Sequence, residues 1–151
     1  MSANNNATNG KVFEYLIALV LAKEHLRPFY FQAQVTFVPN AIYDFLFYTS
    51  TGRPVVLSAK VSLRERYKQA DLEAMALKNV HRRAEAWLIT LSEAEAASLK
   101  PKIEKGEAYG LDGVILADHP EFTDLLDRWR KENFVEAPSV PVVQGTIGKP
   151  I

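Results

Sequence analysis

Two charged residues stand inside segments that are otherwise apolar. Asp44 lies within the stretch IYDFLF, and Lys60 closes the stretch VVLSAK. An ionised side chain in such surroundings needs an opposite charge, a metal ion or a shifted pKa. Because adjacent strands lie about 4.8 Å apart, the two residues can meet at the edge of a sheet if the segments pair. Such a pair suits metal-assisted phosphodiester hydrolysis, with the carboxylate holding a divalent cation and the lysine serving the attacking water. An ordinary salt bridge, or Asp44 at a strand end reaching water, explains the pair equally well.

A helix predicted after Lys60 adds further charged residues. Four of them crowd its N-terminal turn, where a helix favours anions: Arg64, Glu65, Arg66 and Lys68. Glu73 follows Arg66 by seven residues and Gln69 by four, so the three share one helical face. Core positions flank that face, and we therefore expect Glu73 within reach of Asp44 and Lys60. The alternative is a charged helix face that only meets solvent.

Length and composition predict a single domain. The chain has 151 residues and no cysteine, which excludes a disulfide scaffold and thiolate metal ligands and fits a reducing compartment. Eighteen Lys and Arg balance eighteen Asp and Glu, and zero net charge taken alone argues against a nucleic-acid binder. Residues 60–83, however, hold seven basic residues against three acidic ones, which the rest of the chain offsets. This polarised chain is typical of a protein with one surface that approaches phosphate.

Hydrophobic periodicity predicts the elements that position these residues. We expect a polar, mobile tail over residues 1–9, then a helix from Lys11 to His25 on the apolar positions Val12, Tyr15, Leu16, Ala18, Leu19 and Ala22. Pro28 ends it. Three strands follow, at Phe29–Phe37, Ala41–Tyr48 and Val55–Val61. The first alternates, with its odd-numbered residues from Phe29 to Phe37 on one face, and Pro39-Asn40 marks the turn after it. No apolar run reaches the roughly 20 residues that span a membrane.

The second half of the chain alternates helices and strands. Ser62 and Glu65 match a capping box and predict a helix that starts at Ser62. The remaining elements are a strand at Ala86–Leu91, a helix from Ser92 to Lys105, a strand at Leu111–Ala117 and a helix at Pro120–Lys131. Residues 135–151 form an extended tail. The predicted fold is α/β, a mixed five-stranded sheet with helices on both faces, in one domain over residues 10–134.

The order αβββαβαβα, with Asp44 on the second strand and Ser58-Ala59-Lys60 on the third, resembles the PD-(D/E)xK nuclease superfamily. The superfamily's acidic residue two before the lysine is Ser58 in this chain. The type II restriction endonucleases of CCGG-like sites, the NgoMIV–EcoRII group, have a similar S-x-K motif, with the acidic residue moved to the next helix. Here twelve residues separate Lys60 from Glu73. Arg64-Glu65-Arg66 is similar to the basic-acidic-arginine triplet with which that group reads CC and GG.

This resemblance implies a Mg²⁺-dependent endonuclease that cuts double-stranded DNA as a homodimer, at a palindrome containing CC and GG. It implies a catalytic set of Asp44, Ser58, Lys60 and Glu73. The implied metal ligands are Asp44, Glu73, the Ala59 carbonyl and Glu14 of the first helix. The implied DNA-binding residues are Arg64, Glu65, Arg66, Lys68 and Gln69. Arginine pairs with guanine O6 and N7 and glutamate accepts from cytosine N4, which suits the triplet. The implied location is cytoplasmic, for a protein encoded by a bacterium, an archaeon or a phage.

Two other functions stay open. A repair or junction nuclease of the same fold would select DNA shape, and its arginines would contact phosphates. A non-catalytic DNA-binding relic would explain Ser58 in place of the acidic residue. For Glu14, an ordinary helix glutamate stays open as the alternative.

Overall fold

One five-stranded mixed sheet forms the centre of the molecule, in a computed structural model that describes residues 3–64 and 66–138. The strands lie in the order β1 (Tyr30–Val35), β2 (Val38–Tyr48), β3 (Pro54–Lys60), β4 (Glu85–Thr90) and β5 (Gly113–Leu116). Strand β2 is antiparallel to both β1 and β3, whereas β4 and β5 run parallel to β3. This sheet, with helices on both faces, confirms the predicted fold class and element order.

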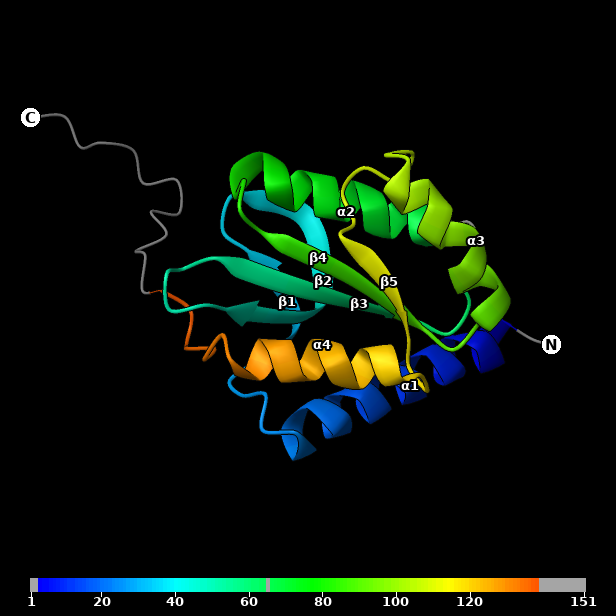
Figure 1. Ribbon diagram of the computed structural model, residues 1–151, viewed down its shortest axis with the longest axis horizontal. Helices are drawn as coiled ribbons and strands as arrows, with labels where there is room; N and C mark the ends of the chain where they lie inside the picture. The colour runs from blue at the N-terminus through cyan, green and yellow to red at the C-terminus, as the bar shows by residue number, and fades with distance from the viewer. Residues whose placement is uncertain (1–2, 65, 139–151) are drawn as a thin grey trace, which may run out of the picture.

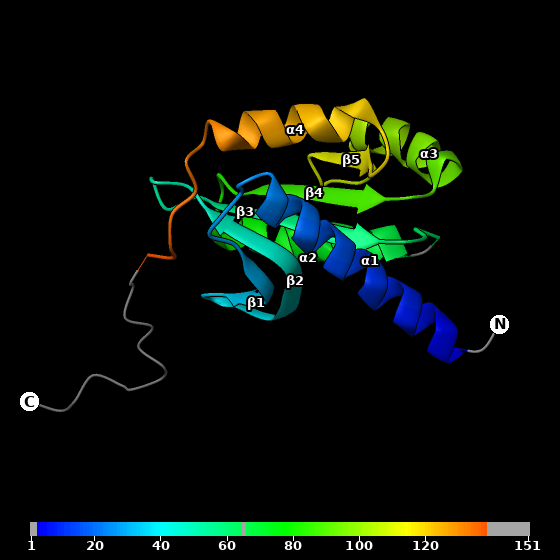
Figure 2. The ribbon, with the colours of Figure 1, turned by 90° about the horizontal axis from the view of Figure 1, so that it is seen from below.

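Two helices cover each face of the sheet (Figures 1 and 2). On one face lie α1 (Ala3–Lys23) and α4 (Pro120–Arg130), and on the other lie α2 (Arg66–Val80) and α3 (Glu93–Glu104). The α1/α4 side buries a core that includes Phe13, Ile17, Leu21, Phe45, Phe47, Leu57, Leu126 and Trp129. The α2/α3 side buries a second core that includes Val56, Ala70, Ala74, Leu77, Leu88, Ala96 and Leu99. No helix of the described residues is both long and apolar enough to cross a membrane.

Helix α1 differs from the prediction in its start and in its buried face. It begins at Ala3, so residues 3–9 of the expected tail are helical. Once the apolar segment has formed a turn, each further residue adds a hydrogen bond without a new nucleation cost. The buried face is Phe13, Ile17 and Leu21, whereas the predicted positions Val12, Tyr15, Leu16 and Leu19 are exposed. Because this helix is apolar on both sides, periodicity alone did not decide which side faces the sheet.

The β1–β2 hairpin turns at Thr36 and Phe37, not at Pro39-Asn40 as predicted. Val35 pairs with Val38, which leaves a two-residue loop, and Phe37 has a positive φ of 65°. Pairing is irregular between Ala33 and Val35, and proline, which lacks a backbone N–H, is tolerated beside such a bulge. Pro39 and Asn40 therefore lie inside β2.

Strand β1 does not keep the single apolar face that its alternating sequence predicted. Phe31 packs on Phe45 of the α1/α4 core, whereas Ala33 packs against the α2/α3 core. Residues two apart in a regular strand share a face. Gln32, between them, has a positive φ of 51°, and this turn of the backbone reverses the alternation.

Helix α2 begins at Arg66, four residues after the predicted start, and Ser62 does not cap it. The Ser62 hydroxyl donates instead to the Glu95 carboxylate of α3, over 3.2 Å. The cap of α3 is confirmed, because Ser92 Oγ accepts a hydrogen bond from the backbone N–H of Glu95. In the predicted C-terminal tail, Val135 pairs with Tyr48, and residues 139–151 lie outside the described part of the chain.

Candidate active site

Asp44 lies where strands β2 and β3 separate. Their ladder ends at the pair Phe45 and Leu57, and the Asp44 carboxylate accepts the next free backbone N–H, that of Ala59, over 2.8 Å. Lys60 Nζ lies 3.4 Å from the same oxygen, Oδ2. The predicted meeting of Asp44 with Lys60 is therefore confirmed. It occurs between two interior strands of the sheet, with Asp44 only 6% exposed.

Gln32 and Glu14 complete the surroundings of this carboxylate. One nitrogen, Gln32 Nε2, lies 3.1 Å from Asp44 Oδ1 and 3.1 Å from Glu14 Oε2. Burial, followed by the neighbouring Asp44 carboxylate, raises the pKa of Glu14 above its ordinary value. Glu14 of α1 therefore lies beside Asp44, as the resemblance implied. Gln32 was missed, because a strand of strict alternation places it on the polar face, and only the positive φ directs it to Asp44.

Ser58 and Lys60 share one face of β3, as predicted. The residues that alternate with them, Leu57 and Ala59, belong to the core under α1 and α4. Ser58 is buried, whereas the Lys60 side chain keeps 30% of its surface exposed. The lysine can thus contact both the buried carboxylate and solvent, which a base or a water-orienting group needs.

Glu73 is not brought into this group. Its carboxylate accepts a hydrogen bond from Gln69 Nε2 over 2.9 Å, one turn earlier on α2. Its backbone carbonyl accepts from the Tyr43 hydroxyl over 2.6 Å, which ties this turn of α2 to β2. Within residues 3–64 and 66–138, no three His, Cys, Asp or Glu side chains lie together as a metal-binding group. The carboxylate beside Asp44 is instead that of Glu14, and carboxylate oxygens are ligands of the kind that Mg²⁺ prefers.

The predicted DNA-binding residues lie around the start of α2. Arg64, Arg66, Lys68 and Gln69 are exposed, and Glu65 lies outside the described residues. A pocket of about 130 Å³ next to them is lined by Asn9, Val61, Ser62, Arg64 and Arg66. It joins α1, the end of β3 and the start of α2, so two guanidinium groups lie near the strand that carries Lys60.

Glu95 of α3 holds the segment that carries Arg64. Its carboxylate accepts from the Ser62 hydroxyl and from the backbone N–H of Leu63. The Leu63 hydrogen bond is the largest of the interactions that lower the pKa of Glu95 below its ordinary value. Leu63 itself is 2% exposed, so its burial and the Glu95 contacts together hold the backbone at Ser62 and Leu63, just before Arg64.

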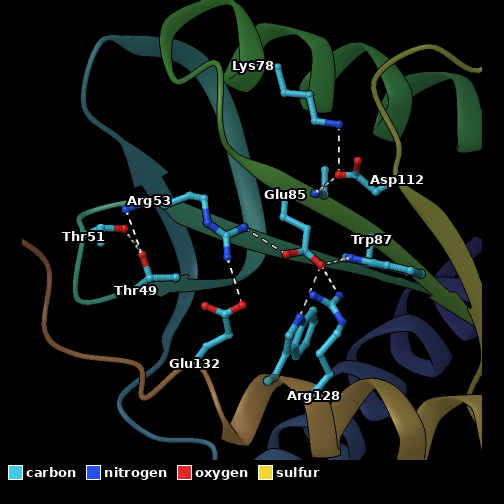
Figure 3. Close-up of polar contacts among 11 residues, drawn as sticks. Thr49, Thr51, Arg53, Lys78, Glu85, Trp87, Asp112, Arg128 and Glu132 are labelled. Atoms are coloured by element: carbon cyan, nitrogen blue, oxygen red, sulfur yellow. Dashed lines mark hydrogen bonds and ion pairs between the residues drawn. The ribbon is translucent and has the colours of Figure 1, made fainter.

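A second charged cluster lies at the opposite end of the sheet (Figure 3). Glu85, at the start of β4, accepts hydrogen bonds from Arg53, Trp87 and Arg128. Burial alone would raise the pKa of Glu85, but hydrogen bonds from Arg128, Arg53 and Trp87 outweigh it and lower the pKa to about 2. This cluster was not predicted from the sequence, since its members are spread from residue 53 to residue 128.

A solved structure is similar to this chain in its fold. It is described as the restriction endonuclease PspGI in complex with substrate DNA, with a TM-score of 0.60 and 16% sequence identity. The match covers 90% of this chain and 54% of that one, so this chain spans about half the length of its neighbour. No family model and no curated protein sequence matches the chain. The likeness shows a restriction-endonuclease-like fold.

Proposed function

We propose that this protein is a Mg²⁺-dependent DNA endonuclease that cuts at a palindrome containing CC and GG. The observation that carries the proposal is the fork between β2 and β3, where Asp44 contacts Ala59 N–H and Lys60 Nζ. On a restriction-endonuclease-like fold, a carboxylate and a partly exposed lysine at such a fork suit hydrolysis of a phosphodiester bond. The DNA-bound neighbour adds support for double-stranded DNA as the substrate.

Each residue has a role in this proposal. Asp44, Glu14 and the carbonyl of Ala59 are ligands of the cation, which polarises the phosphate and the attacking water. Lys60 orients that water or takes its proton. Ser58 lies two residues before Lys60, at the position where the superfamily has an acidic residue. Glu73 is the further carboxylate that the resemblance implies, although its carboxylate accepts a hydrogen bond from Gln69 in the structure.

The recognition part of the proposal rests on the start of α2. Arg64, Glu65 and Arg66 read base edges, and Lys68 and Gln69 contact the same duplex. Arg64 and Arg66 are exposed and lie near the catalytic strand, so a duplex that reaches Lys60 can also reach them. The proposal also includes a homodimer, which places one site on each strand of a palindrome. The protein is proposed to be cytoplasmic and to be encoded by a bacterium, an archaeon or a phage.

Cleavage of long duplex DNA tests the activity and the specificity together. Purified protein is incubated with Mg²⁺ and the DNA ends are sequenced; one recurrent palindromic end sequence is expected. Lys60→Ala should lower the cleavage rate roughly 10²- to 10⁴-fold and leave DNA binding intact, as loss of a general base does. Lys105→Ala, an exposed lysine at the end of α3, is the matched control. Random ends would remove the sequence-specific claim, and the absence of cutting would remove the enzyme.

The exposed arginines also support a second candidate, a nuclease that selects DNA shape through phosphate contacts. Glu65→Gln separates the two. A base reader should lose discrimination between its site and a variant site, because glutamate accepts from cytosine N4. A phosphate binder should bind all sequences slightly more tightly, since one negative charge is removed.

A further inference from the structure

The amide group of Gln32 lies between the two carboxylates of the candidate site. Its nitrogen carries two hydrogens, and one carboxylate oxygen lies 3.1 Å away on each side, from Asp44 and from Glu14. An amide nitrogen only donates, so this contact uses both hydrogens at once. The positive φ of Gln32 and the reversal of the β1 face make this placement possible.

Two neighbouring carboxylates repel each other, and each raises the pKa of the other unless a positive or donating group lies between them. Lys60 is such a positive group, but its ammonium lies 3.4 Å from Asp44 Oδ2, which is not the oxygen that Gln32 contacts. The oxygens that face Glu14 are served by Gln32 instead. The Gln32 amide therefore contacts both of the carboxylates that would hold a cation.

We propose that Gln32 is a placeholder for the divalent cation. Its amide holds Glu14 and Asp44 together, and it would have to leave both carboxylates before they could hold a cation. Gln32 is thus a positioning residue that weakens metal binding in return for an ordered pair of carboxylates. This inference rests on the proposed function, because it takes Asp44 and Glu14 as the ligands.

Calcium titration by calorimetry tests the inference without any cleavage measurement. Gln32→Met removes the donor, and Gln32→Asn keeps an amide that tolerates positive φ but is one methylene too short to bridge both carboxylates. Both variants should bind Ca²⁺ roughly tenfold more tightly than the original protein, because the cation no longer competes with two hydrogen bonds. Gln34→Met, an exposed glutamine two residues further along β1, should leave the affinity unchanged.

Thermal unfolding supplies a second measurement. Without metal, Gln32→Met should melt at a lower temperature than the original protein, and saturating Ca²⁺ should remove most of this difference. An unchanged or weaker Ca²⁺ affinity in both Gln32 variants would overturn the proposal that Gln32 is a placeholder. A weaker affinity would indicate that Gln32 is itself a ligand of the cation. Failure of the original protein to bind Ca²⁺, or equal binding by Asp44→Asn, would overturn the proposed metal site as well. The two failures are therefore distinguishable.

Discussion

Asp44 combines a structural role with its proposed chemical one. Its carboxylate accepts the Ala59 N–H that would otherwise lack a strand partner, so the side chain stabilises the fork between β2 and β3. A charged hydrogen bond of this kind is worth about 1.5–3 kcal/mol. The same contact fixes the orientation of the carboxylate next to Lys60. The site is therefore ordered before any ligand binds, which reduces the cost of binding one.

The proposed role of Glu73 in cleavage can be tested with a single substitution. If it is the displaced carboxylate, Glu73→Gln should lower cleavage by about a hundredfold, since even residues that only orient a metal ligand are worth roughly 10- to 100-fold. Steady-state cleavage of a defined duplex measures the effect. Glu107→Gln, an exposed glutamate in the loop after α3, is the control. A Glu73→Gln variant with full activity would refute the role and leave Glu14 as the second carboxylate.

Single residues were predictable from the sequence where their type conflicted with their surroundings. Asp44 and Lys60 stood out as charges within apolar strands, and the structure joins them. Gln32 did not stand out, because a glutamine in an alternating strand is ordinary, and its role depends on one backbone angle. Helical spacing placed Glu73 near the sheet, but it did not predict that Gln69 would bind its carboxylate.

Element types were predictable throughout, whereas element ends depended on distant partners. The apolar periodicity marked every helix and strand in order. The start of α2 was misplaced because the Ser62 hydroxyl binds Glu95, a residue 33 positions later. The hairpin turn was misplaced because Thr36 and Phe37 carry no turn signature, whereas Pro39-Asn40 does. Such contacts between elements override local preferences.

Asp71 shows how one side chain joins two elements. This residue of α2 is 8% exposed, and its carboxylate accepts the backbone N–H groups of Tyr109, Gly110 and Leu111 over 3.1, 2.7 and 3.1 Å. Gly110 packs so closely that a Cβ would lie 2.5 Å from the Asp71 carbonyl oxygen. The contact therefore ties the loop before β5 to α2.

Asp71→Ala should destabilise the fold by about 3 kcal/mol, because three backbone N–H groups, two of them buried, lose a charged acceptor. Urea unfolding followed by circular dichroism measures the change. Asp124→Ala, an exposed position on α4, should change stability by less than about 0.5 kcal/mol. Equal stability of the two variants would show that solvent replaces the Asp71 contacts.

Over the molecule as a whole, basic side chains gather at both ends of the sheet. The basic residues of the segment 60–83 do not form one surface, because α2 carries them from one end to the other (Figure 1). Arg64 and Arg66 lie at the Asp44 end, whereas Arg82 and Arg83 line a pocket of about 240 Å³ with Arg53 at the other. Lys78 is paired with Asp112 over 2.9 Å. Although the net charge of the chain is zero, basic side chains are therefore concentrated locally at the start of α2.

The Glu85 cluster makes stability depend on acid pH. Because the pKa of Glu85 is lowered to about 2, the carboxylate contributes stability above its ordinary pKa and loses it as pH falls toward 2. Glu85→Gln should therefore cost about 3 kcal/mol near neutral pH, the equivalent of the pKa shift, and progressively less below pH ~4.5. Unfolding free energies of both proteins between pH 2 and 7 test this. A difference that does not shrink toward low pH would show that Glu85 acts through packing alone.

The outer side of α1 has an exposed apolar stripe that bears on assembly. Figure 2 looks onto this side, which no other described element covers. Its apolar residues Val12, Tyr15, Leu16 and Leu19 are 50–66% exposed and repeat at helical spacing, and the Tyr15 ring contacts Phe31 at 5.7 Å between centroids. A contiguous exposed apolar stripe is typical of a protein interface. The stripe also flanks Glu14, so a partner that covers it would lie beside the candidate site.

If the proposed homodimer uses this stripe, Leu16→Glu combined with Leu19→Glu should convert it to a monomer. Both leucines are already exposed, so the substitutions should alter the stability of the monomer by less than about 0.5 kcal/mol. Sedimentation velocity measures the assembly. On a supercoiled plasmid, the monomer should nick one strand or lose activity instead of cutting both. Leu72→Glu, at a leucine of α2 that is 64% exposed, is the matched control and should remain a dimer. A double variant as dimeric as the original protein would place the interface elsewhere, and an original protein that cuts both strands as a monomer would remove the homodimer from the proposal.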